Sequence, residues 1–172
     1  MKSLTILRHA KSSRDEPGLD DFDRPLNERG RKSARQMGKE LKRRKMRFDL
    51  VLASAAVRVQ ETLEDFAAGY GEDLEIGVDS RIYEATVQSL IGVIRAVPDR
   101  VGRAMIVGHN PGLQQLVLAL AGDDGEGLRA RVESKFPTAA AAVIELDIET
   151  WGDAGPGTGR IHELILPREL TD

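Results

Sequence analysis

The run Leu4-Thr5-Ile6-Leu7-Arg8-His9-Ala10 gives the first indication of how this chain is organised. Its first half is apolar and β-forming, which predicts a buried strand, and it ends abruptly in Arg8 and His9. In open α/β sheets ligands bind beyond the carboxyl ends of the strands, so both side chains would lie where a ligand binds. A guanidinium group offers a fork of donors suited to phosphate, and an imidazole acts as nucleophile or proton carrier. Because an Arg-His pair is short and common, the pair taken alone slightly favours another interpretation, in which both side chains only end a strand in solvent.

The same design recurs later in the chain. Residues 103–107 predict a second buried strand, and Gly108-His109-Asn110-Pro111-Gly112 turns sharply into a helix expected at 113–121. A helix N-terminus presents free N–H groups, so His109 would stand beside an anion site. A lone histidine in such a turn is more often structural, but a second histidine at the end of a second apolar strand points to function.

Strands and helices alternate between these two units. Apolar spacing predicts strands at 48–53 and 74–78 and helices at 27–44, 55–68 and 87–96, with Asn27 and Ser54 as N-caps and Gly69 closing the second helix. Arg58 falls about one turn into that second helix. An arginine there is normally a solvated surface charge, but from the carboxyl edge of a sheet it can reach back over the strand ends.

A long polar segment, residues 10–26, follows the first strand. It carries the turn-forming residues Pro17-Gly18, the acidic cluster Asp20-Asp21-Phe22-Asp23 and Arg24-Pro25. A loop of this length in a compact domain is usually functional or disordered. Because it follows directly on Arg8 and His9, we expect it to help line a pocket.

The last third of the chain carries weaker signals. We expect a loop at 122–127, a short helix at 128–132, and two strands at 139–146 and 161–166 that form an antiparallel hairpin. His162 is interpreted as an ordinary strand residue. Because the sequence contains no internal repeat and no convincing linker, we expect a single α/β domain over residues 1–172.

The composition narrows the class of protein. The 172 residues are 41% hydrophobic and 31% charged, which is typical of a globular domain with a real core, and the net charge of -3 does not favour a nucleic-acid partner. The basic run at 42–45 is interpreted as complementing the dipole of a helix end. The chain has no cysteine, so disulfides and thiolate ligands or nucleophiles are excluded. Without a leader or an apolar run of bilayer length, we expect a cytoplasmic protein with no membrane contact.

An ordered set of residues at the strand-helix junctions resembles the histidine phosphatase (phosphoglycerate mutase-like) superfamily. The set comprises Arg8-His9-Ala10, Ser54 and Arg58 with Gln60 and Thr62, Glu84, and Val107-Gly108-His109-Asn110. The motifs that resemble its SixA-type phosphohistidine phosphatase branch are Arg8 to Ser13, Asp23-Arg24-Pro25-Leu26 and Lys135-Phe136-Pro137-Thr138. The resemblance covers residues 4 to about 143. It implies a three-layer α/β/α sandwich around a central, mostly parallel mixed sheet, and a phosphatase that needs no cofactor or metal.

The resemblance also implies a role for each site residue. His9 would be the nucleophile that carries the phosphoryl group as phosphohistidine. Arg8 and Arg58 would bind the phosphoryl oxygens, and His109 would complete the phosphate site. Glu84 is the candidate proton donor to the leaving group. This assignment is weaker than the other four, because a glutamate in a loop is usually only solvated and SixA-type members do not all use such an acid.

Two positions depart from the family pattern. Ala10 stands where a glycine commonly follows the first histidine, which would change how closely the backbone approaches phosphate. Ala55 stands where a proline often starts the second motif, a change expected to matter little.

Several functions stay open at this level. Since the chain has no long insertion to cover the site, an open pocket favours a phosphohistidine displayed on a protein, and a small phosphorylated substrate is the alternative. A metal-dependent hydrolase would use His9, His109 and Glu84 as ligands, but two flanking arginines disfavour a cation. A non-catalytic phosphate-binding module would keep the arginines without turnover.

Overall fold

The computed structural model of the chain describes residues 1–122 and 126–170. In this part of the chain a single sheet of six strands has the order β3-β2-β4-β1-β5-β6. The strands are β1 (Lys2–Arg8), β2 (Leu50–Ala53), β3 (Ile76–Val78), β4 (Arg103–Gly108), β5 (Ala141–Leu146) and β6 (Gly159–Ile165). The first four run parallel, whereas β5 is antiparallel to β1 and β6 is antiparallel to β5. The predicted mostly parallel mixed sheet and its C-terminal hairpin are therefore confirmed.

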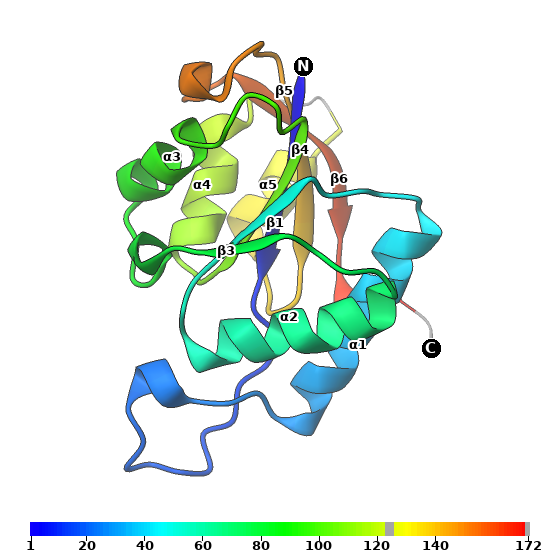
Figure 1. Cartoon of the computed structure of the whole chain (residues 1–172), viewed down its shortest axis with the longest axis vertical. Helices are drawn as coiled ribbons and strands as arrows, with labels where there is room; N and C mark the ends of the chain where they lie inside the picture. The colour runs from blue at the N-terminus through cyan, green and yellow to red at the C-terminus, as the bar shows by residue number, and fades with distance from the viewer. Residues whose placement is uncertain (123–125, 171–172) are drawn as a thin grey trace.

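Helices cover both faces of this sheet, with α1 and α2 together on one face and α3, α4 and α5 on the other (Figure 1). They are α1 (Glu28–Arg43), α2 (Val57–Tyr70), α3 (Val87–Arg95), α4 (Gly112–Leu120) and α5 (Leu128–Ser134). Successive side chains of a strand point to opposite faces. Leu7 accordingly packs with Met37 and Phe66 of the α1–α2 face, while its neighbour Ile6 packs with Leu113 of α4. The expected three-layer sandwich is confirmed.

The register of β1 and β4 fixes the position of the site. The two strands pair in parallel, and Arg8 lies opposite Gly108. The next residue of each chain segment is a histidine, so His9 and His109 leave the sheet side by side. Both strands are buried on both faces, which is why their sequences are continuous apolar runs.

Helix α2 differs at both ends from the sequence-based prediction. It starts at Val57 after Ala56, so Ser54 is not its N-cap, and it ends at Tyr70 with Gly71 in the left-handed conformation (φ 78°). Gly69 lies inside the helix instead of closing it. The reason is packing: a Cβ on Gly69 would lie 2.1 Å from the backbone oxygen of Arg35 in α1, so this glycine lets the two helices approach.

The remaining predicted elements are present with small shifts at their ends. Asn27 caps α1 as expected, because its side chain accepts a hydrogen bond from the Gly30 amide at 2.8 Å. The segment 10–26 contains one 3-10 turn, η1 (Asp21–Asp23). Of the loop expected at 122–127, residues 123–125 lie outside the described residues. No helix in the described ranges is both long and apolar enough to span a membrane.

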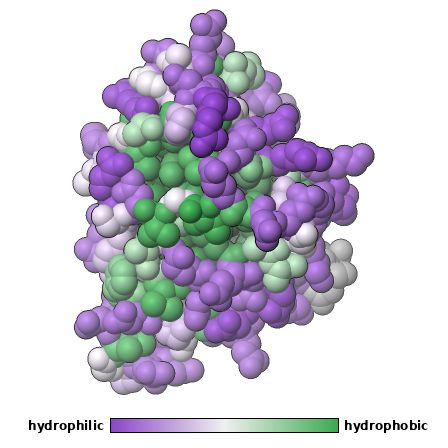
Figure 2. Space-filling model, in the orientation of Figure 1, coloured by the Kyte–Doolittle hydropathy of each residue, from purple (hydrophilic) through white to green (hydrophobic). Residues whose placement is uncertain are grey.

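Strand β3 lies at one edge of the sheet and leaves apolar side chains in solvent. Ile76 is 41% exposed and Val78 is 56% exposed. Figure 2 shows apolar surface across the middle of the face that β3 crosses in Figure 1, surrounded by hydrophilic residues. The alternation of apolar residues in this segment therefore marks a strand whose apolar side chains are largely uncovered.

The helix contact provides a test of the fold. We expect Gly69→Ala to lower the free energy of unfolding by about 1–3 kcal/mol, since the added methyl group must push α1 away. The matched control is Gly92→Ala in α3, where a Cβ meets nothing within 4 Å, and we expect that change to raise stability by about 0.5–1 kcal/mol. Urea denaturation of both variants measures the difference, and equal effects of the two substitutions would contradict the packing argument.

Candidate active site

Four of the predicted site residues meet at the carboxyl edge of the sheet. Arg8 and His9 come from the end of β1, Arg58 from the first turn of α2, and His109 from the turn after β4. The rings of His9 and His109 are 5.3 Å apart between centroids. All four side chains line a pocket of about 750 Å³, and Glu84 lines it as well. The sequence thus predicted which residues come together.

His9 is held as a neutral imidazole whose Nε2 carries no proton. It is only 6% exposed, and its Nδ1 donates to the Ala10 carbonyl oxygen at 2.7 Å. Because a carbonyl only accepts, Nδ1 carries the proton and Nε2 keeps its lone pair. Burial, followed by the charges of His109, Arg58 and Arg8, lowers the pKa of His9 to about 3, against the opposing hydrogen bond to Ala10. At neutral pH this nitrogen therefore carries a lone pair in a cationic pocket.

The turn after His9 is fixed by α2. The Ala10 amide donates to Thr62 Oγ1 at 3.0 Å, and that hydroxyl donates to the Arg58 carbonyl oxygen at 2.7 Å. Ala10 is completely buried and its side chain packs in a small apolar cluster with Leu26 and Ala34. The alanine that departs from the family pattern therefore has its amide engaged by α2.

Arg8 is partly buried and only partly satisfied. Its Nη1 donates to the Phe136 carbonyl oxygen at 3.1 Å, which also accepts from the Asn110 side chain at 2.9 Å. Its Nε is buried and has no hydrogen-bond partner among the described residues. Burial and the neighbouring Arg58 lower the pKa of Arg8. An unsatisfied donor of this kind suits an oxyanion.

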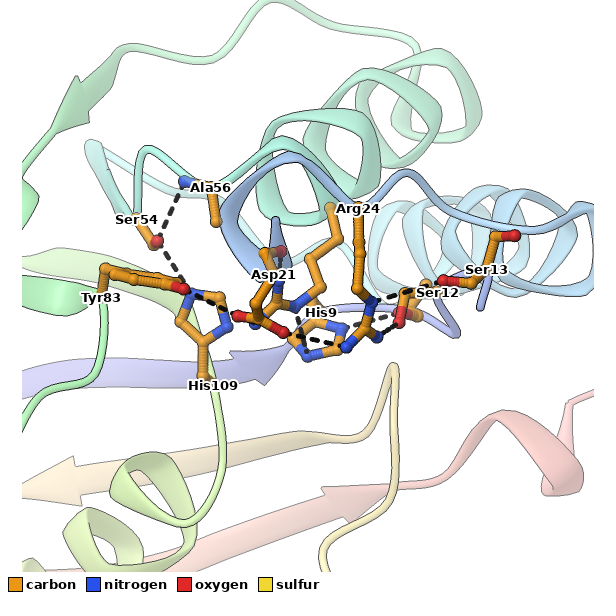
Figure 3. Close-up of polar contacts among 11 residues, drawn as sticks. His9, Ser12, Ser13, Asp21, Arg24, Ser54, Ala56, Tyr83 and His109 are labelled. Carbon is orange, nitrogen blue, oxygen red and sulfur yellow. Dashed lines mark hydrogen bonds and ion pairs between the residues drawn. The ribbon is translucent and has the colours of Figure 1, made fainter. Parts of the chain in front are cut away.

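His109 is paired with a residue that the sequence assigned elsewhere. Its Nε2 shares a hydrogen bond of 2.8 Å with Ser54 Oγ, so the serine expected to cap α2 instead orients the second histidine (Figure 3). Burial, followed by Arg58, lowers the pKa of His109 to about 4, while Asp21 acts in the opposite direction. The second ring nitrogen, Nδ1, is buried without a hydrogen-bond partner among the described residues.

Arg58 has a partner that sequence analysis missed. Its Nη2 contacts the Asp21 carboxylate at 3.0 Å, its Nη1 donates to the Asp21 backbone carbonyl at 2.7 Å, and its Nε donates to His9 Nε2 at 3.4 Å. Asp21 also accepts from the Tyr83 hydroxyl at 2.7 Å. This hydrogen bond is the main reason why the pKa of Asp21 is lowered, and it raises the pKa of Tyr83 to about 12. The acidic cluster in the 10–26 loop was the sequence signal for such a partner. Which cation Asp21 contacts depends on how that loop folds over the site, so the sequence did not predict the pair with Arg58.

Glu84 lies at the rim of the pocket and not among the buried groups. Its side chain is exposed and makes no hydrogen bond or ion pair with the described residues. Its backbone has φ 52°, an uncommon conformation for a residue other than glycine. The described part of the chain holds no cluster of three or more His, Cys, Asp or Glu side chains suited to a metal ion.

The chain has relatives in both sequence and structure. The model of the histidine phosphatase superfamily (branch 1) matches residues 4–142. An uncharacterised protein of Mycobacterium tuberculosis is 34% identical over 164 residues, which cover 94% of this chain and 100% of that protein.

Two solved structures extend the comparison. A protein of Agrobacterium tumefaciens assigned as the phosphohistidine phosphatase SixA superposes with a TM-score of 0.81 at 30% identity, covering 96% of this chain and 98% of its own. The protein histidine phosphatase SixA in complex with tungstate has the same fold, with a TM-score of 0.78 at 24% identity over 96% of this chain and 97% of its own. The resemblance inferred from the motifs is confirmed: this chain belongs to the histidine phosphatase superfamily, with similarity to its SixA-type branch, and is a phosphatase.

Proposed function

We propose that this phosphatase works without a cofactor and uses His9 as its nucleophile. The observation that carries the proposal is the state of His9: Nδ1 donates to the Ala10 carbonyl oxygen, and the unprotonated Nε2 lies 3.4 Å from Arg58 Nε. A neutral imidazole can attack phosphorus directly, and neighbouring guanidinium groups stabilise the charge on the phosphoryl oxygens as the group transfers.

The reaction proceeds in two displacements. First, His9 Nε2 bonds to phosphorus while the bond from phosphorus to the leaving oxygen or nitrogen breaks. Arg8, Arg58 and His109 bind the phosphoryl oxygens during this step. Water then attacks phosphorus, the phosphorus–nitrogen bond breaks, and inorganic phosphate leaves the neutral histidine behind.

Glu84 is our candidate for the proton donor to the leaving group and for the base that later activates water. Its exposed position at the rim agrees with a role toward a leaving group that points to solvent. A phosphorylated imidazole leaves readily, so its hydrolysis needs little acid assistance. An alkyl phosphate would depend on Glu84 more strongly.

Phosphohistidine on a protein is the proposed substrate. The pocket is open, because Lys11, Arg14 and Glu84 of its lining are exposed to solvent, and a side chain displayed on a protein surface can enter it. The similarity to the Agrobacterium protein supports the same choice. A small phosphoester is the alternative substrate of the same chemistry.

The proposal is tested by the dephosphorylation of a phosphohistidine-bearing protein and of an aryl phosphate, both in the presence of a chelator. We expect His9→Ala to lower kcat/KM for both by at least about a thousandfold, since no other group replaces the nucleophile. In the native protein, quenching in alkaline detergent, in which the phosphorus–nitrogen bond of phosphohistidine survives, should trap labelled phosphate on His9. The ratio of the two rates tells whether phosphohistidine is preferred. Phosphate binding without turnover of either substrate would leave only a binding module.

The ionisation of the two histidines gives a second prediction. Because burial lowers the pKa of His9 to about 3 and that of His109 to about 4, both rings should stay neutral between pH 5 and 8. The unfolded chain takes up these protons near pH 6.5, so stability should fall as the pH drops below that value. Imidazole nitrogen NMR measures both titrations, and a midpoint above pH 6 for His9 would contradict the assigned protonation state.

A further inference from the structure

Arg58, which the proposed function assigns to the phosphoryl group, is already bound to an anion of the protein itself. The carboxylate of Asp21 lies on Nη2 of Arg58 at 3.0 Å and also accepts from the Tyr83 hydroxyl at 2.7 Å. Figure 3 shows Asp21 reaching into the cluster from the loop, beside the rings of His9 and His109. The guanidinium Nε is 3.4 Å from the nucleophilic Nε2 of His9. The carboxylate on the Arg58 guanidinium group therefore lies close to the place where the phosphoryl group must bind.

The loop holds Asp21 in this position by several contacts. Arg24 Nη1 donates to Oδ1 of Asp21 at 2.9 Å, while Oδ2 takes the bonds from Arg58 and Tyr83. Phe22 packs edge-on against the Tyr83 ring, with centroids 5.2 Å apart. The Asp21 backbone carbonyl accepts from Arg58 Nη1 at 2.7 Å. Both carboxylate oxygens are thus engaged, but by different cations.

This division of contacts allows the carboxylate to leave Arg58 without becoming unpaired. If Oδ2 moves away, Oδ1 keeps its bond to Arg24, and the backbone carbonyl can keep the loop attached through Nη1. The side chain of Asp21 is 49% exposed, so water can take over the remaining hydrogen bonds. Nη2 of Arg58 would then be available to a phosphoryl group, on the same guanidinium as the Nε that lies 3.4 Å from His9 Nε2.

We propose that Asp21 is an internal competitor for the phosphoryl site: its carboxylate occupies Nη2 of Arg58 in the empty protein and is displaced when a phosphoryl group binds. The inference rests on the proposed function, because it takes Arg58 as a ligand of the phosphoryl group. Its consequence is weaker binding of free phosphate, which speeds product release. A phosphoprotein can recover the lost affinity through contacts at the rim, whereas inorganic phosphate cannot.

Asp21 could instead position Arg58 for the phosphoryl group, and this role predicts the opposite change in phosphate affinity when Asp21 is removed. If Asp21 only positions Arg58 for the phosphoryl group, its removal lets the guanidinium move and weakens phosphate binding. If Asp21 competes, its removal strengthens binding. The sign of the change therefore distinguishes a competitor from a positioning residue, and a poorly folded variant cannot produce a gain in affinity.

The experiment is a calorimetric titration of inorganic phosphate into the native protein, Asp21→Asn and Asp21→Ala. We expect the Kd for phosphate to fall about three- to tenfold in both variants, since a partly exposed charge pair no longer has to be broken. Tyr83→Phe, which removes one hydrogen bond to the carboxylate, should shift Kd in the same direction by a smaller factor. The matched control is Asp23→Asn, which removes the same charge from the same turn at a side chain outside the pocket lining, and its Kd should stay within about twofold.

An unchanged or raised Kd in Asp21→Asn would overturn the inference, as would an equal gain of affinity in Asp23→Asn. The KM for an aryl phosphate should fall together with the Kd. The titration involves no turnover, so the two proposals fail separately. If phosphate is trapped on His9 but Asp21→Asn binds it no more tightly, only the competitor role is wrong. If Asp21→Asn gains affinity but no phosphohistidine forms, only the nucleophile assignment is wrong.

Discussion

The parallel pairing of β1 with β4 supports the whole site. Each strand is buried between two helical layers, and their register places Arg8 opposite Gly108. The two histidines that follow are therefore neighbours although they are far apart in the sequence. A shift of the register by one residue would turn Arg8 toward another face and separate the rings. The packing of each layer opposes that shift, because Leu7 fits against α1 and α2 and Ile6 against α4, and the shift would exchange such side chains between the two layers.

The second support is the contact between α1 and α2. Arg58 and Thr62 lie on α2, so the position of both depends on how closely this helix packs. Gly69 permits the approach to α1, and Thr62 joins α2 to the turn after His9 by a hydrogen bond to Ala10. Helix packing, turn geometry and the position of a guanidinium group are thus one connected arrangement.

Electrostatics in this pocket depends on the carbonyl groups as much as on the charged side chains. Burial keeps His9 and His109 neutral, which removes two of the four potential positive charges. The arginines are solvated by backbone oxygens, Arg8 by Phe136 and Arg58 by Asp21. These carbonyl oxygens offset part of the free-energy cost of burying two guanidinium groups, and the Asp21 carboxylate balances part of the remaining positive charge. The pocket can therefore hold several hydrogen-bond donors for an anion.

Strand periodicity is a local property, so the sequence alone predicted the α/β architecture, and the motif resemblance singled out Arg8, His9, Arg58 and His109, which the structure brings together in one pocket. The sequence also determined the cap of α1, because Asn27 acts on its own helix. It did not reveal that Ser54 orients His109, that α2 ends at Gly71, or that Asp21 occupies Arg58. Those outcomes come from contacts between segments far apart in the chain. Side chains of the same kind at the same spacing can form different pairs, and only the packing of α2 and the 10–26 loop against the sheet decides which pair forms.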